Sequence, residues 1–177
     1  MVRIAIDMDE VIADFYFKDL QMYNDLYETD LELNDLKDQY VSELYPETEK
    51  IMKFIRNTKG FFKDLPVIED AQEVIKELML HHEIFITSAA MDFPNSFDDK
   101  FYWMQRNFPF IEKKNIVFCG NKSIIQADYL IDDHVHHFDG FAGTGLLFTA
   151  HHNKQISFPN RMNNWQDVRE FFNRLAD

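Results

Sequence analysis

The chain alternates between short apolar runs and longer segments in which apolar residues recur at helical spacing. A short apolar run bounded by polar residues is typical of a buried strand. Strands that alternate with helices predict an α/β fold with a parallel sheet covered on both faces, which binds ligands at the carboxyl ends of its strands. We predict strands at Val2–Ile6, Ile84–Ile86, Ile116–Phe118, Tyr129–Ile131 and Leu146–Phe148.

Three segments repeat apolar residues every three to four positions, which is the spacing of an amphipathic helix. We expect each helix to pack on the sheet by its apolar face. The predicted helices and their inward residues are Ala71–Leu80 with Val74, Ile75, Leu78 and Met79, Asp99–Phe108 with Phe101, Met104 and Phe108, and Trp165–Leu175 with Trp165, Val168, Phe171, Phe172 and Leu175.

Residues 16–64 break this alternation, because they hold no clear strand. Helical patterns occur near residues 17–28, 31–44 and 47–58. An insertion directly after the first strand would lie over the carboxyl edge of the sheet. We therefore predict a core domain of residues 1–15 and 65–177 and a small helical cap of residues 16–64.

Composition narrows the class of partner. The 177 residues carry a net charge of -13, without a basic stretch, which disfavours binding to nucleic acid polymers or an anionic membrane surface. No apolar stretch approaches the roughly 20 residues that span a bilayer, and Asp7 interrupts the first run too early for a signal peptide. The single cysteine, Cys119, excludes an internal disulfide and fits a reducing compartment. We expect a cytoplasmic protein; its oligomeric state stays open.

Polar residues follow four of the predicted strands. Asp7 and Asp9 follow the first strand and point to the same side of an extended chain. Convergence of these groups at one sheet edge predicts an octahedral Mg²⁺ site for a phosphorylated substrate. Each signal alone has a simpler explanation, such as a solvated turn, a helix cap or a surface lysine. The other groups are Thr87 and Ser88, then Lys122, then Asp132 and Asp133.

The order of these motifs resembles a known family. DMDEVIADF, IFITSAA, GNK and ADYLIDD follow one another as do the four motifs of haloacid dehalogenase (HAD) superfamily phosphatases. DMDEVIADF and the spacing from Lys122 to ADYLIDD are most similar to the 5'(3')-deoxyribonucleotidases. The resemblance implies a Rossmann-like core of about five parallel strands flanked by helices, with a cap after the first motif. It also implies a Mg²⁺-dependent phosphomonoesterase of nucleotide metabolism that acts on deoxyribonucleoside monophosphates.

The resemblance also assigns roles. Asp7 resembles the nucleophile, which we expect to be ionised at pH 7 from a reference pKa of roughly 3.9, and Asp9 resembles the general acid and base. Thr87 and Ser88 would bind a phosphoryl oxygen, and Lys122 would neutralise the transferring group. The implied Mg²⁺ ligands are the Asp7 side chain, the Asp9 backbone carbonyl and Asp133, with Asp132 a further ligand or a partner of the ligands.

Some positions depart from this pattern. Glu10 stands where a small residue is common, His134 stands where an arginine is common, and no basic residue follows Ser88 closely. These changes leave the nucleotide preference open. We interpret His134, His136 and His137, like the pairs at 81–82 and 151–152, as surface histidines, because adjacent histidines rarely converge on a metal.

Aromatic residues near the insertion could bind a base. Phe15, Phe61 and Phe62 are candidates for stacking, although any one of 18 phenylalanines can equally belong to the core. Three alternatives remain: a phosphatase for another small metabolite such as a sugar phosphate, a non-catalytic phospho-receiver module, and a degenerate phosphatase. Asp9 disfavours the receiver, which needs no second acid at that position, and the presence of every motif residue disfavours the degenerate enzyme.

Overall fold

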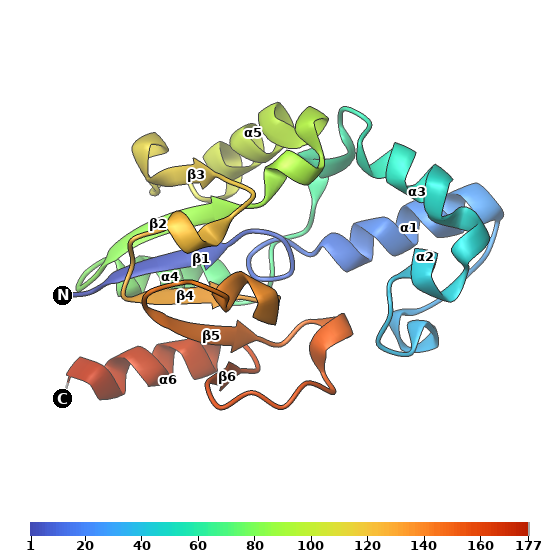
Figure 1. The fold of residues 1–177 in the computed structure, drawn as a ribbon. Coiled ribbons are helices and arrows are strands. Elements are labelled where there is room, and N and C mark those ends of the chain that lie inside the picture. Colours follow the sequence, from blue (N-terminus) through green and yellow to red (C-terminus); the bar gives the residue numbers. More distant parts are fainter. Residues whose placement is uncertain (177) are drawn as a thin grey trace.

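The computed structural model describes residues 1–176, and over this range the chain forms one parallel sheet of six strands (Figure 1). The strands lie in the order β3-β2-β1-β4-β5-β6. Because every neighbouring pair is parallel, the carboxyl ends of all strands meet at one edge. The bounds are β1 Arg3–Asp7, β2 Glu83–Ser88, β3 Ile116–Phe118, β4 Tyr129–Asp132, β5 Thr144–Phe148 and β6 Arg161–Met162.

The parallel α/β sheet confirms the predicted fold class, and five strands lie at the predicted apolar runs. The sixth strand, β6, exceeds the expectation of about five strands. It contains only Arg161 and Met162, which pair with Leu147 and Phe148 of β5. A two-residue strand has no apolar run, so the periodicity of the sequence gives no sign of it.

The sheet is covered on both faces, but by different kinds of structure. Helices α4 (Ala71–Leu78), α5 (Phe97–Asn107) and α6 (Trp165–Ala176) contribute to one large apolar cluster with Ile4 and Ile6 of β1. On the other face, Ala5 and Leu130 pack against Phe141, beside the 3₁₀ segments η7 (Lys122–Ile124) and η8 (Val135–Phe138). This second face therefore has a thinner covering, from which short segments reach the sheet edge.

Two of the predicted inward positions are wrong. Phe101 is only half-buried, whereas Trp103 is fully buried and donates its indole N–H to the Leu65 carbonyl at 2.8 Å. Leu175 is 51% exposed in the last turn of α6. The buried face of α5 is therefore rotated away from Phe101, and this rotation brings Lys100 inward as well.

Residues 15–64 form a helical insert that lies beyond the carboxyl ends of the strands (Figure 1). The segment predicted as a helix over 31–44 is broken, because Lys37 and Asp38 have positive φ angles of 51° and 62°. The insert has its own apolar cluster, which includes Tyr16, Leu20 and Met52. Its elements are α1 (Phe15–Tyr27), η1 (Leu33–Leu36), α2 (Val41–Leu44), η2 (Pro46–Thr48), α3 (Glu49–Arg56) and η3 (Phe61–Asp64).

The chain enters and leaves the insert at adjacent points. Asp14 N–H donates to the Pro66 carbonyl at 2.9 Å, and Ile68 N–H donates to the Ile12 carbonyl at 3.0 Å. The insert is thus joined to the rest of the fold by two paired segments. Among the helices that the structure describes, none is long and apolar enough to cross a membrane.

Candidate active site

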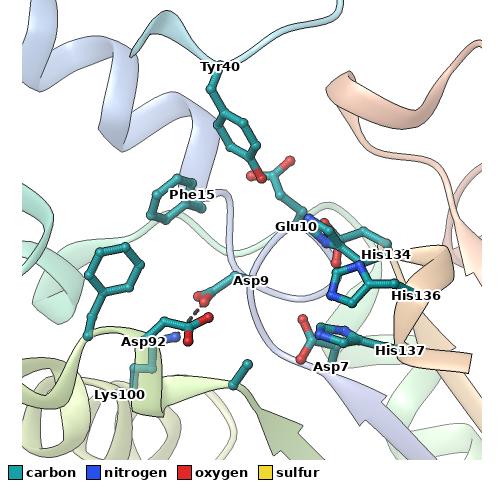
Figure 2. A pocket seen from close by; sticks show the side chains of 13 residues that line it. Asp7, Asp9, Glu10, Phe15, Tyr40, Asp92, Lys100, His134, His136 and His137 are labelled. Atoms are coloured by element: carbon teal, nitrogen blue, oxygen red, sulfur yellow. Dashed lines mark hydrogen bonds and ion pairs between the residues drawn. The ribbon is translucent and has the colours of Figure 1, made fainter. Parts of the chain in front are cut away.

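Asp7 and Asp9 lie on a closed loop at the carboxyl end of β1 (Figure 2). The N–H of Ala13 donates to the Met8 carbonyl at 2.9 Å, and the N–H of Glu10 donates to the Ala13 carbonyl at 2.8 Å. Glu10 has a φ of 60°, in the left-handed region, so the chain reverses within a few residues. The loop keeps both carboxylates close to the strand end, where a substrate can reach them.

Lys122 approaches Asp7 from the face of the sheet that the 3₁₀ segments cover. Its Nζ contacts the Asp7 carboxylate and lies 2.5 Å from Oδ2 of Asp132. Thr87 pairs with Asp7 in the parallel register and therefore points to the same face. The Thr87 hydroxyl donates to the Ile6 carbonyl at 3.4 Å. The structure thus brings Asp7, Thr87, Lys122 and Asp132 together, as the motif order predicts.

Lys100 approaches from the opposite face, and sequence reasoning missed it. Its Nζ contacts the Asp9 carboxylate, lies 3.0 Å from the Ser88 hydroxyl and sits 4.5 Å from the centre of the Phe62 ring. Lys100 and Lys122 are each only 1% exposed. A basic side chain therefore reaches Ser88 from α5 rather than from the residues directly after Ser88. A lysine on the buried face of an amphipathic helix is the signal that could have revealed it.

The acidic residues carry more negative charge than Lys122 balances. Carboxylate oxygens of Asp7, Asp132 and Asp133 lie within 4.8 Å of one another, and all three residues are buried. Burial, opposed only in part by Lys122, raises the pKa of Asp7 to about 8. Burial acts on Asp132 too, but Lys122 and His137 hold the pKa of that carboxyl well below its usual range.

This charge imbalance fits a divalent cation. The expectation that Asp7 is ionised at pH 7 used the pKa of an exposed aspartate. Without a metal cation beside it, the buried carboxyl of Asp7 favours its neutral form. A cation among these oxygens would restore the ionised form. Hard carboxylate oxygens are the donors that Mg²⁺ prefers, so the donor set matches the predicted cofactor.

Histidines gather around the acidic pair, so the expectation of surface histidines is wrong for His134, His137 and His152, whereas His136 is exposed as expected. Nδ1 of His137 lies 2.9 Å from Asp132 Oδ1, and Nδ1 of His134 lies 2.9 Å from Asp133 Oδ2. Burial alone would lower the pKa of His134, but the Asp133 carboxylate raises it to about 9. The histidines converge because the loops after β4 and β5 meet at the sheet edge; the pair at 81–82 lies elsewhere, after α4.

An aromatic wall lines the side of the pocket formed by the insert. Phe15 and Tyr40 line the pocket together with Phe93, and their rings meet edge to face at 6.2 Å (Figure 2). Phe61 and Phe62 do not line this pocket, because both are buried behind Phe15 with ring centres 5.7 and 5.9 Å from it. Tyr40 and Phe93 were not predicted, since neither lies near a recognisable motif.

Glu10 lines the pocket but has a structural partner. Its Oε1 accepts the N–H of Tyr16 in the first turn of α1 at 2.7 Å. Burial raises the pKa of Glu10 well above its usual value, and the Tyr16 hydrogen bond opposes that shift only in part. The residue that departs from the family pattern is therefore a link between the β1 loop and the insert.

Comparison with known proteins identifies the family. The family model described as "5' nucleotidase, deoxy (Pyrimidine), cytosolic type C protein" matches residues 1–176. The chain belongs to this family. A Staphylococcus epidermidis relative is 41% identical over 173 residues, which cover 98% of this chain and 97% of that protein. The Bacillus subtilis 5'(3')-deoxyribonucleotidase is 37% identical over 170 residues, which cover 93% of this chain and 95% of that protein.

Solved structures agree on the fold of this nucleotidase family member. A haloacid dehalogenase-like protein of unknown function from Agrobacterium tumefaciens matches with a TM-score of 0.64 at 13% identity and covers 100% of both chains. The magnesium-bound HAD hydrolase YfnB of Bacillus subtilis matches with a TM-score of 0.63 at 12% identity and covers 97% of this chain and 98% of that chain. At these identities the likeness concerns the fold.

Membership in the nucleotidase family settles the class of activity. The chain is a hydrolase of phosphoric monoesters, which confirms the enzyme predicted from the four motifs. The interpretations as a non-catalytic phospho-receiver module or a degenerate phosphatase are set aside. The resemblance to HAD phosphatases and to 5'(3')-deoxyribonucleotidases is confirmed as well.

Proposed function

We propose that the protein is a Mg²⁺-dependent 5'(3')-deoxyribonucleotidase that dephosphorylates deoxyribonucleoside monophosphates through an aspartyl-phosphate on Asp7. The observation that supports this most directly is the arrangement of charge. Two carboxylates at the end of β1 are each paired with a buried lysine, Asp7 with Lys122 and Asp9 with Lys100. The names of the relatives supply the substrate class.

In this proposal the cation is held by the Asp7 and Asp133 carboxylates and the Asp9 backbone carbonyl. Asp132 is occupied by Lys122, His137 and the backbone N–H of His134, so it supports the ligands rather than adding one. When bound, Mg²⁺ would offset the repulsion between the Asp7 carboxylate and the incoming phosphate. Asp133 is buried and lines the pocket, which suits it as a direct ligand.

The first half-reaction transfers the phosphoryl group to the enzyme. The ionised Asp7 carboxylate attacks phosphorus, the bond from phosphorus to the ester oxygen breaks, and Asp9 gives its proton to that oxygen. Asp7 and Asp9 suit these roles because they lie two residues apart on one loop that faces the pocket. The products of this step are the free nucleoside and an aspartyl-phosphate.

The second half-reaction restores the enzyme. Asp9, now ionised, takes a proton from a water molecule whose oxygen attacks phosphorus, and the bond to Asp7 breaks to release phosphate. Lys122 and Thr87 would stabilise the transferring group from one face of the sheet. Lys100 and Ser88 would do so from the other face.

The nucleoside would lie against the aromatic wall. Phe15 and Tyr40 offer ring faces to a base, and Phe93 adds a third aromatic ring to the pocket lining. Phe61 and Phe62 would pack against the Phe15 ring and hold it in position. In this proposal residues 16–64 act as a cap over a core of residues 1–15 and 65–177, in a cytoplasmic enzyme of nucleotide metabolism.

The test is phosphate release from deoxyribonucleoside and ribonucleoside monophosphates and sugar phosphates, with and without Mg²⁺. Asp7→Asn is the control, because an amide cannot form the aspartyl-phosphate. We expect Mg²⁺-dependent release that favours deoxynucleotides and is absent in Asp7→Asn. Release from sugar phosphates alone would contradict the proposed substrate class but would not contradict the proposed mechanism. Release that persists in Asp7→Asn would overturn the mechanism.

A further inference from the structure

Two histidines from separate loops converge on the carboxylate of Asp133. His134 follows β4 directly, and His152 lies in η9 (His151–Asn153) after β5. Nδ1 of His134 lies 2.9 Å from Asp133 Oδ2, and Nε2 of His152 lies 3.7 Å from the same oxygen. One ligand atom from each of the three residues lies within 4.8 Å of the others.

The chemistry of this set differs from that of the three aspartates. Two imidazole nitrogens with one carboxylate favour a borderline metal such as Zn²⁺, whereas Mg²⁺ prefers oxygen donors alone. In a tetrahedral Zn²⁺ site with bonds near 2.05 Å, ligand atoms lie about 3.4 Å apart. The separations of Asp133 Oδ2 from His134 Nδ1 and from His152 Nε2, 2.9 and 3.7 Å, lie on either side of that value. The three residues can therefore close on an ion with small side-chain shifts, provided that the ion displaces the proton between His134 Nδ1 and Asp133, as metal binding to a histidine requires.

The surrounding structure holds the two loops together. Asn153 is fully buried, and its side-chain N–H groups donate to the Asp133 carbonyl at 2.8 Å and to the Phe148 carbonyl at 2.7 Å. The His152 ring stacks on Tyr40 with centres 5.7 Å apart. This scaffold brings the His152 and His134 rings to 4.4 Å between centres.

His152 also has unused binding capacity. Its Nδ1 is buried and has no hydrogen-bond partner among residues 1–176. Its Nε2 approaches Asp133 only to 3.7 Å, beyond hydrogen-bonding range. Its Nε2 faces the Asp133 carboxylate, so this nitrogen can bind an ion placed between the two side chains.

We propose that Asp133, His134 and His152 form a second cation site, selective for a transition-metal ion of the Zn²⁺ class, which withdraws Asp133 from Mg²⁺ and so inhibits the enzyme. The inhibition rests on the proposed function, because it requires Asp133 to be a Mg²⁺ ligand. The site itself rests only on the three residues. Water would complete the coordination, since the three side chains leave a fourth position open.

Binding of Zn²⁺ alone, measured by titration calorimetry, tests the site without any activity assay. The variants are His152→Gln and His134→Gln, and the matched control is His81→Gln, which removes an exposed histidine after α4. We expect one site in the wild type and in His81→Gln, weakened at least about tenfold in either ligand variant. His134 is the more exposed ligand, so His134→Gln keeps the test valid if His152→Gln unfolds. Equal affinity in all four proteins would overturn the site.

A second measurement tests the inhibition. Inhibition of phosphate release by Zn²⁺ should weaken as Mg²⁺ is raised, and His152→Gln should need at least about tenfold more Zn²⁺ than His81→Gln. Zn²⁺ inhibition that is independent of both Mg²⁺ and His152 would overturn the competition. A protein that binds Zn²⁺ through His152 but releases phosphate from nothing would refute the proposed function and leave the site intact.

Discussion

Lys100 and Lys122 are two buried lysines that meet the carboxylates of β1 from opposite faces of the sheet. Lys122 contacts Asp7 and Asp132, whereas Lys100 contacts Asp9 and donates to the Ser88 hydroxyl. A phosphate placed above Asp7 would therefore have one ammonium on each side. The two ammonium groups offset part of the carboxylate charge at the site, and the proposed cation would offset more of it, which favours the approach of an anionic substrate.

We predict that Lys100→Met lowers kcat by about a hundredfold, because it removes one fixed positive charge from the transferring group. Methionine keeps most of the apolar side chain and removes the ammonium group, including its contact with the Phe62 ring. The matched control is Lys114→Met, at an exposed position outside the pocket, and it should keep the wild-type rate. The measurement is kcat for one deoxynucleotide by steady-state kinetics. A Lys100→Met enzyme with the wild-type kcat would show that Lys100 has only a structural role.

Phe15 allows a test of how the nucleoside is bound. Phe15→Ala should lower kcat/KM for a deoxynucleotide by about tenfold or more and leave that for deoxyribose 5-phosphate nearly unchanged, since base stacking contributes about 1–3 kcal/mol. Phe54→Ala, an exposed position on α3, is the control. Equal losses on both substrates would show that Phe15 supports the fold rather than the base.

At this scale the motifs predicted much of the site. Asp7, Asp9, Asp132 and Asp133 lie directly at strand ends, where apolar runs stop and the topology brings them together. Lys100 and Tyr40 could not be predicted in the same way, because neither follows a strand. Lys100 lies on the buried face of α5, and Tyr40 lies in a loop of the insert. The positions of such residues depend on how elements pack, which periodicity alone does not specify.

Among the elements, α1 and α3 are tied by a buried ion pair. Arg56 of α3 donates to both carboxylate oxygens of Asp19 on α1 at 2.7 and 2.6 Å, and Asp19 is 1% exposed. The Arg56 guanidinium also lies 5.7 Å from the centre of Phe15 and 5.9 Å from that of Tyr40. The pair therefore fixes the helices behind the aromatic wall.

We predict that Arg56→Met lowers the free energy of unfolding by about 3–5 kcal/mol, because it leaves the Asp19 carboxylate buried without a partner. Burial raises the pKa of Asp19 even beside Arg56, so the loss should shrink at acidic pH as the carboxyl takes up a proton. Arg169→Met, which breaks more exposed pairs with Glu73 and Glu77, should lower the free energy of unfolding much less. Urea denaturation that gives the two variants equal losses would contradict this assignment.

The elements were predictable where the sequence repeats a period. Strands β1 to β5 lie within about two residues of the predicted runs, since apolar runs specify buried strands directly. The helix expected over 31–44 is wrong because Lys37 and Asp38 adopt left-handed φ angles, and aspartate is only a weak signal for such a conformation. Glycine or asparagine would be the usual signal for such a turn.

At the scale of the whole molecule, a latch joins the loop after β5 to the insert. Asp38 N–H donates to His151 Nε2 at 3.1 Å, and the Gln155 side chain donates to the Asp38 carboxylate at 3.1 Å. Since His151 accepts this bond, its ring must be neutral in the folded protein. Burial, together with Lys154, lowers the pKa of His151 accordingly.

This latch predicts a pH dependence of stability. As pH falls, the unfolded chain protonates His151 first, near its ordinary pKa of about 6.5, so the stability contributed by the neutral ring is complete above that pH and is lost below it. The free energy of unfolding should therefore fall less between about pH 7.5 and 5.5 in His151→Gln than in the wild type. His81→Gln is the matched control and should keep the wild-type slope; identical slopes in His151→Gln and the wild type would rule the latch out.

The paired entry and exit of the insert have a consequence for how such enzymes diversify. Ala13 and Val67 form an antiparallel bridge, so the two points where the insert leaves and rejoins the core are immediate neighbours. In the proposed mechanism the phosphoryl-transfer groups belong to the core, whereas Phe15 and Tyr40 come from the segment between those points. A chimera that exchanges this segment between relatives should change which nucleoside is accepted while it inherits the same chemistry. Exchange of the insert at this paired junction can therefore change the substrate range separately from catalysis.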